Sequence, residues 1–319
     1  MSGIDMATRI FYATDIHSSW KCWKKFINAG SFYKADVCIL SGDLTGKAIV
    51  PVVETSIGKY KVNLAEQELI LKSEEELEGT EKHIKDIGLY PYRTNPDEME
   101  ELKADPKRID EIFEGLMIER VREFIVYADE KLSNSKTKRY ICLGNDDSLS
   151  IDKIIEKSQY ITVVEGMVVR IDDDHEMASS GWTNPTPWDT PRECIEEELY
   201  KRIEGVVSEI EDVPKSIFNL HAPPYGSGLD EAPQLSPDLK VSHSGRIKVP
   251  VGSTSVRKII EKYQPLLGLH GHIHECRGTA QIGRTLCVNP GSAYDQGSLL
   301  GSVILLEDNS IRSHIPIFG

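Results

Sequence analysis

Short apolar runs bounded by turn residues recur along this chain. The six clearest runs are 9–14, 36–40, 138–143, 216–220, 266–269 and 285–288. Runs of this length are typical of strands that are buried on both faces. Further runs at 161–164, 167–171, 176–180, 302–306 and 311–315 predict additional strands.

Segments with a helical spacing of apolar residues separate these strands. In residues 18–29, Trp20, Trp23, Phe26 and Ile27 follow two serines that can cap a first turn. Residues 191–212 and 254–263 show a similar pattern. Strands that alternate with helices predict an α/β fold, and this many strands favours two sheets packed face to face between helices.

Residues 46–138 interrupt the alternation, because a compact α/β unit connects neighbouring strands in far fewer residues. Here we expect short strands at 50–53, 60–62 and 68–71, a polar helix near 74–87 and a strong helix at 108–132. The segment is therefore predicted to be an α+β cap subdomain inserted into a core formed by residues 1–45 and 139–319. It either packs on the core as decoration or borders the functional site and limits substrate size.

Composition narrows the class of protein. The chain has 319 residues, a net charge of −14 and six cysteines with no C-x-x-C pair, which favours reduced thiols over disulfides or a thiolate zinc site. The negative charge disfavours nucleic acid as a partner and favours a small phosphate-ester substrate, although bound metal ions reverse the sign locally. The chain lacks a membrane-length apolar run and an apolar leader, so we expect a cytoplasmic protein with no membrane partner.

Residues with metal-ligand chemistry follow five of the predicted strands. They are Asp15, His17, Asp43, Asn145, His221, His272 and His274. Each motif alone is more often a polar turn, a helix cap or a hydrogen-bonded histidine. Together they belong at one edge, because ligands of open α/β sheets bind at the carboxyl ends of the strands. Three oxygen donors and four imidazoles exceed the needs of one tetrahedral zinc and suit two ions of higher coordination number that share a carboxylate.

In this order the motifs resemble those of the calcineurin-like metallophosphoesterase superfamily. They are D-x-H at 15–17, G-D at 42–43, G-N-x-D at 144–147, an H-x-P-type histidine at 221 and G-H-x-H at 271–274. The resemblance covers about 1–45 and 139–319 and implies a four-layer α-β-β-α sandwich of two mixed sheets. It also implies that Asp15, His17 and His274 bind one ion, that Asn145, His221 and His272 bind a second, and that Asp43 bridges them. The turn at 289–292 would support these ligands from outside.

The activity that the resemblance implies is hydrolysis of small phosphodiesters or phosphomonoesters by a hydroxide that bridges two divalent metal ions. The ligand set suits manganese, iron, zinc, cobalt or nickel. Two alternatives remain, a nuclease of the same superfamily and a catalytically inactive scaffold that has lost its metals. The presence of all seven ligands counts against the scaffold. The sequence does not determine the oligomeric state.

One position departs from the family pattern, which has a histidine where this chain has Asp146. A carboxylate beside two cations is expected to be ionised, which makes it a poor general acid and repels a phosphate dianion. We therefore expect diesters to be preferred. Asp146 and His221 are the candidate catalytic residues. His175, His243 or Tyr225 could supply the missing acid, although a structural role is the more common explanation for each.

A turn-rich segment at 181–188 holds two tryptophans. Trp182 and Asn184 are candidate substrate contacts, together with the ligand Asn145. Trp188 is expected instead to anchor the loop by burying its indole ring.

Overall fold

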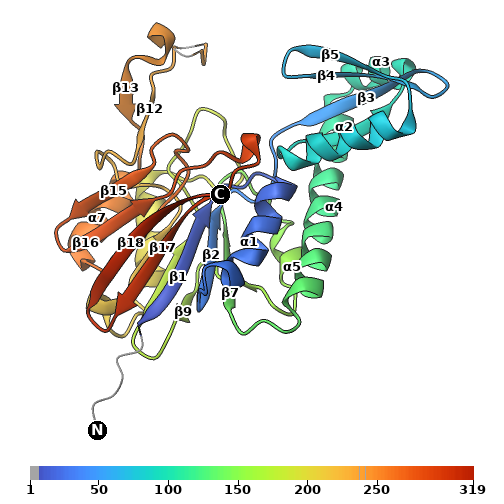
Figure 1. Ribbon diagram of the computed structural model, residues 1–319. Coiled ribbons are helices and arrows are strands. Elements are labelled where there is room, and N and C mark those ends of the chain that lie inside the picture. The colour runs from blue at the N-terminus through green and yellow to red at the C-terminus, as the bar shows by residue number, and fades with distance from the viewer. Residues whose placement is uncertain (1–6, 237, 241) are drawn as a thin grey trace.

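The computed structural model describes residues 7–236, 238–240 and 242–319 (Figure 1). One six-stranded mixed sheet has the order β18 (Ser310–Phe318), β17 (Leu300–Glu307), β1 (Thr8–Thr14), β2 (Val37–Gly42), β7 (Lys138–Leu143) and β8 (Thr162–Val163). β1, β2, β7 and β8 run parallel to one another, and β17 and β18 are antiparallel additions at one side. The carboxyl ends of the parallel strands therefore share one edge.

The second six-stranded sheet has the order β15 (Gly278–Ile282), β16 (Thr285–Asn289), β14 (Leu267–Leu269), β11 (Ile217–Leu220), β10 (Glu176–Ser180) and β9 (Val168–Arg170). Its four central strands are parallel, and β15 and β9 are antiparallel edge strands. The mixed α/β class predicted from the sequence is confirmed.

The strands are buried on both faces, as their continuous apolar runs predict. Along β1, Ile10 and Tyr12 join a core cluster that also contains Met177 and Leu267 of the second sheet. The alternate residue Phe11 joins a different cluster with the helices of the other face. The side-chain period of two in a strand thus places one core between the sheets and one outside the first sheet.

Helices cover the outer face of each sheet. α1 (Trp20–Phe32), α4 (Pro106–Leu132) and α5 (Asp152–Ile155) contribute to the core beside the first sheet. α6 (Glu196–Val207) and α7 (Thr254–Tyr263) pack against the second sheet through side chains such as Ile203 and Ile259. α1 begins at residue 20 because the Ser19 side chain accepts a hydrogen bond from the backbone nitrogen of Cys22 at its N-terminus.

Residues 46–138 contain a separate four-stranded sheet with the order β5 (Gln67–Leu71), β4 (Lys59–Leu64), β3 (Ile49–Ser56) and β6 (Tyr90–Thr94). α2 (Glu74–Asp86) and α3 (Pro96–Ala104) accompany it, and a small core that includes Val52, Val62, Leu77 and Ile84 holds β3, β4 and α2 together. Figure 1 shows this sheet standing away from the two large sheets, with α4 leading back to them beside α1.

A hairpin of β12 (Glu231–Pro233) and β13 (Lys248–Pro250) projects from the opposite side of the molecule in the same view (Figure 1). Short 3-10 helices lie at Val213–Lys215, Ser242–Gly245 and Tyr294–Gln296. Among the described residues, no helix combines the length and the apolar character needed to cross a membrane.

Candidate metal centre

The seven predicted ligands follow strands whose carboxyl ends face the same way. Asp15, Asp43 and Asn145 come after β1, β2 and β7 of the first sheet, and His221 comes directly after β11 of the second. The loop after β1 also carries His17, and the loop after β14 carries the last two ligands, His272 and His274. The two sheets thus bring together side chains from opposite ends of the sequence.

Asp15, His17 and His274 form one group whose candidate ligand atoms all lie within 4.8 Å of one another. Nε2 of His17 lies 3.0 Å from Nε2 of His274. Nδ1 of His17 lies 3.1 Å from the carbonyl oxygen of Thr45, which can only accept, so in the neutral ring Nδ1 carries the proton and Nε2 offers its lone pair. Burial lowers the pKa of His17 and keeps the ring neutral, the form that binds a metal ion.

Asp15, Asp43 and His221 form a second group within the same limit of 4.8 Å. Asp43 lies between the two groups, because its Oδ2 is 3.7 Å from Nε2 of His17 and its Oδ1 is 3.6 Å from Nε2 of His221. Asp43 therefore faces both groups, which is the placement that a bridging ligand requires, and Asp15 is itself a member of each group.

Asn145 and His272 lie beside His221 of the second group. Oδ1 of Asn145 lies 3.1 Å from Nε2 of His221, while its Nδ2 donates to Oγ1 of Thr190 at 2.9 Å, which orients the amide. The ring centroid of His272 lies 5.2 Å from that of His221. Burial, together with the nearby His221, lowers the pKa of His272 to about 3.

The chemistry of these donors fits divalent cations. Burial and the carboxylates of Asp146, Asp15 and Asp147 raise the pKa of Asp43, so these acidic groups destabilise one another without a compensating positive charge. Nε2 of His221 is buried and lies 3.8 Å from Oδ1 of Asp15 and 3.6 Å from Oδ1 of Asp43. A buried lone pair beside clustered carboxylates is the arrangement that a metal ion would satisfy.

Glycines allow the ligand loops to approach one another. A Cβ atom on Gly144 would lie 2.2 Å from Oδ1 of Asp43, and one on Gly271 would lie 2.5 Å from Oδ2 of Asp15. Three ligands themselves have left-handed backbone, with φ of 50° at Asp15, 37° at His17 and 66° at His272. Such strain persists only where the surroundings fix it, and it is typical of functional sites.

Hydrogen bonds outside the ligand set hold the loops in place. The buried carboxylate of Asp147 accepts from the backbone nitrogens of Leu44, Thr45 and Gly144 at 2.8–3.2 Å, which ties the loop after β2 to the loop after β7. In the predicted supporting turn, Oγ of Ser292 donates to the carbonyl oxygen of Asp15 at 2.6 Å. The sequence motif contains Asp147, but no pattern in the sequence indicated this contact.

Asp146 has neighbours that the sequence did not indicate. Nζ of Lys47 lies 2.9 Å from its Oδ2, and Nδ2 of Asn145 donates to its Oδ1 at 3.1 Å. Sequence reasoning also missed Tyr294, whose ring centroid lies 4.5 Å from that of His17. Neither Lys47 nor Tyr294 belongs to a motif, and only the fold brings them to the centre.

The candidate residues of the loop at 181–188 make contacts of different kinds. Trp182 packs against the core beside α6, with the guanidinium of Arg202 4.1 Å from its ring centroid. Nδ2 of Asn184 donates to the carbonyl oxygen of Val251 at 3.2 Å, and its Oδ1 is buried without a partner in the described part of the chain. Substrate contact by either residue stays a prediction. The expectation for Trp188 was wrong, because the residue is 65% exposed and its indole ring is not buried against the loop.

The structure also bears on the three residues considered as replacement acids. His175 precedes β10 and bonds to Asp172, which places it at the amino end of the strand, away from the ligands. It therefore cannot act as the acid. Tyr225 is 42% exposed and lies four residues after His221. The side chain of His243 lies outside the described part of the structure.

No family model matches the chain. It is 32% identical over 198 residues to the uncharacterized protein MJ1162 of Methanocaldococcus jannaschii, a match that covers 60% of this chain and 78% of that protein. Its fold is similar to that of TT1561 from Thermus thermophilus, with a TM-score of 0.52 and 12% identity over 98% of this chain and 99% of that chain. A weaker likeness is to YfcE, a phosphoesterase from E. coli, with a TM-score of 0.31 and 11% identity over 97% of this chain and 100% of that chain. The chain therefore belongs to one family with MJ1162 and is similar in fold to TT1561, and its ligand motifs are those that resemble the calcineurin-like metallophosphoesterase superfamily.

Proposed function

We propose that this protein hydrolyses small phosphate esters with the help of two divalent metal ions. The observation that carries the proposal is the position of Asp43 between two groups of candidate ligands, one with His17 and His274 and the other with His221. The layer order that we propose for the core, helix–sheet–sheet–helix, would bring both groups to one end of the two facing sheets.

The residues of the chain have separable tasks in this proposal. When bound, two divalent ions supply an activated water and positive charge for the phosphoryl oxygens. Asp43 holds the two ion positions together, and the neutral imidazoles of His17, His221 and His272, whose pKa values burial lowers, offer lone pairs rather than protons. Thr190 orients the Asn145 amide so that its oxygen faces His221.

The proposal is tested by reconstituting metal-free protein with manganese, iron, zinc, cobalt or nickel. Turnover of 4-nitrophenyl phosphate and bis(4-nitrophenyl) phosphate is then measured for the wild type, Asp43→Asn and the exposed control Asp173→Asn. We expect metal-dependent turnover that falls at least about 100-fold in Asp43→Asn and is unchanged in the control. Protein that binds metal but hydrolyses neither ester would contradict the proposed activity.

A further inference from the structure

Lys47 brings a positive charge from the first residues of the insertion to the metal centre. It lies four positions after Asp43, and its Nζ is 2.9 Å from Oδ2 of Asp146. Its side chain is 48% exposed, whereas that of Asp146 is 18% exposed. The ammonium group is therefore paired with the carboxylate on a side chain that is about half exposed.

The backbone before Lys47 is held in place. The nitrogen of Gly46 donates to the hydroxyl of Tyr90 in β6 at 2.8 Å. A Cβ atom on Gly46 would lie 2.2 Å from the carbonyl oxygen of Gly88, so the chain passes here in close contact with the segment that follows α2. The Lys47 side chain thus begins from a fixed point.

Asp146 is fixed equally well. Its nitrogen donates to Oδ1 of Asp43 at 2.9 Å, and its Oδ1 accepts from Nδ2 of Asn145. Asp146 therefore contacts Asp43 through its backbone nitrogen, and its carboxylate contacts both Asn145 and the ammonium group of Lys47. A surface ion pair alone contributes little, but this pair belongs to a network that reaches the centre.

We propose that Lys47 is a substrate-binding residue whose ammonium group contacts a non-bridging oxygen of the phosphate ester, and that Asp146 positions it. This proposal rests on the proposed function. A lysine ammonium is a compact charge with three donors, which suits a phosphoryl oxygen without imposing a fixed geometry. Asp146 offsets its charge in the free protein and leaves the remaining donors available.

The pair changes the specificity expected from Asp146. An unpaired carboxylate would repel a dianionic monoester more than a monoanionic diester. With Lys47 in place that repulsion is offset, and the ammonium group attracts the dianion more strongly than the monoanion. Lys47 should therefore matter more for monoesters than for diesters.

The test compares the metal-loaded wild type with Lys47→Gln, Asp146→Asn, the double variant and the exposed control Lys59→Gln. kcat and KM are measured for both nitrophenyl esters, inorganic phosphate binding by calorimetry and metal content by mass spectrometry. Lys47→Gln should raise KM for the monoester about tenfold, with a smaller change for the diester and unchanged metal content. In the double variant, the ratio of kcat/KM for the monoester to kcat/KM for the diester should return part of the way to the wild-type value. The reason is that Asp146→Asn removes the negative charge that Lys47 no longer offsets.

The proposal would be overturned if Lys47→Gln changed KM equally for both esters or left the affinity for inorganic phosphate unchanged. Lys47 and Asp146 would then form only a surface ion pair. Loss of metal from Lys47→Gln would also overturn it, because the residue would then act on the ligands. A wild type that hydrolyses neither ester would refute the proposed function instead, and phosphate binding would still decide the role of Lys47.

Discussion

Asp15 shows how single residues build the centre. Its carboxylate accepts hydrogen bonds from the backbone nitrogens of Asp43 at 3.1 Å and His272 at 2.9 Å, so it joins loops of both sheets before any ion binds. Burial raises its pKa, whereas the nearby His221, His274 and His17 and the hydrogen bond from Thr14 lower it, and the net shift is downward. Its left-handed backbone is stable because these contacts leave it no other position.

Asp147 is expected to control metal affinity without binding metal. Asp147→Ala would leave the buried nitrogens of Leu44, Thr45 and Gly144 without their acceptor and release the loop that carries Asp43. We expect the free energy of unfolding to fall by about 3 kcal/mol and metal affinity to fall about 10- to 100-fold. Calorimetric metal titration and urea unfolding measure the two effects, with the exposed Asp173→Ala as control. Unchanged metal affinity in a destabilised Asp147→Ala would show that Asp147 serves folding alone.

Residues with a local signal could be predicted, whereas residues placed by long-range contacts could not. Each of the seven candidate ligands follows an apolar run, so the sequence indicates both its chemistry and its place at a strand end. Lys47 and Arg120 sit in segments whose sequence is typical of ordinary polar surface. Their partners, Asp146 and Ser18, are far away along the chain, and no local pattern specifies such a contact.

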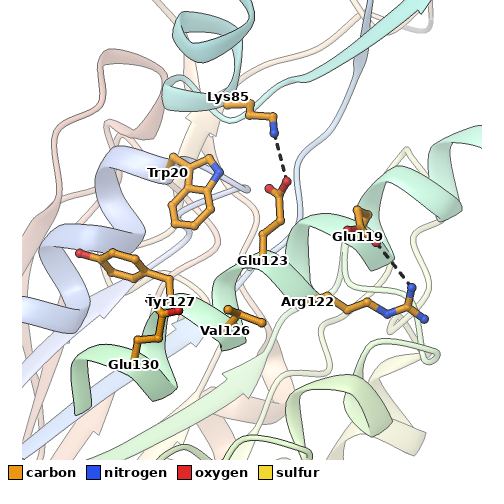
Figure 2. A pocket seen from close by; sticks show the side chains of 8 residues that line it. All are labelled: Trp20, Lys85, Glu119, Arg122, Glu123, Val126, Tyr127 and Glu130. Carbon is orange, nitrogen blue, oxygen red and sulfur yellow. Dashed lines mark hydrogen bonds and ion pairs between the residues drawn. The ribbon is translucent and has the colours of Figure 1, made fainter. Parts of the chain in front are cut away.

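At the scale of elements, α4 of the insertion contacts the ligand loop directly. The buried guanidinium of Arg120 donates to the carbonyl oxygen of Ser18 at 2.7 Å and to its hydroxyl at 3.0 Å. Figure 2 shows the groove beside this contact, of about 430 Å³, lined by Trp20 of α1, Lys85 of α2 and residues of α4. There Nζ of Lys85 lies 3.1 Å from Oε1 of Glu123, whose other oxygen is 3.3 Å from Nε of Arg120. The ion pairs join α2 to α4, and the hydrogen bonds of Arg120 join α4 to the loop that carries His17.

Arg120→Met should therefore weaken both the fold and the metal site. The substitution leaves the backbone of Ser18, which has φ of 63°, without the donor that fixes it. We expect the free energy of unfolding to fall by about 3 kcal/mol or more and metal affinity to fall as His17 loses its position. The matched control is Arg122→Met, two positions along the same helix, where the side chain is 59% exposed. Equal effects of the two substitutions would exclude a special role for Arg120.

The pair of His175 and Asp172, in the turn between β9 and β10, is expected to make the free energy of unfolding depend on pH. Burial is the largest influence on the pKa of His175 and lowers it. The hydrogen bond to Asp172, the charges of Asp172 and Asp174 and a backbone hydrogen bond at Glu307 together raise it by more, so the net shift is upward. A raised pKa means that this contribution is complete below the unfolded value of about 6.5 and is lost as pH rises through the folded value. Between about pH 5.5 and 8.5, urea unfolding should show that the free energy of unfolding falls more with rising pH in the wild type than in His175→Gln. Parallel profiles would exclude the pair as the cause.

Elements with a consistent local pattern were easier to predict than elements with conflicting signals. The strands at 50–53, 60–62 and 68–71 and the helix near 74–87 correspond to β3, β4, β5 and α2. β6 was missed because Pro91 lies within it, and proline disfavours a central strand. The structure resolves the conflict by placing β6 at the edge of its sheet, paired with β3 alone.

At the scale of the whole molecule, the insertion is joined to the centre as well as standing beside it. Its sheet projects away from the two large sheets (Figure 1), but its first and last segments reach the ligand loops through Lys47 and Arg120. A Cβ atom on Gly88 of the same insertion would lie 2.2 Å from the carbonyl oxygen of His17. The role of the segment as a cap that limits substrate size stays a prediction.

Replacing residues 46–138 with a short linker distinguishes the two roles of the insertion. Because the segment supports Ser18 and His17, we expect the shortened protein to bind metal at least about 100-fold more weakly, even where circular dichroism shows a folded core. Metal titration and turnover of small and bulky diesters provide the measurement. Retained metal affinity with faster turnover of bulky diesters would favour a detachable cap instead.

The central claim is that two metal ions share Asp43, and anomalous diffraction from crystals of manganese-loaded protein tests it most directly. We expect two anomalous peaks roughly 3.5–4 Å apart. One lies among Asp15, His17 and His274, the other among Asn145, His221 and His272, and Asp43 contacts both. A single peak, or two peaks with Asp43 outside the coordination sphere of either, would show that Asp43 does not bridge two metal ions.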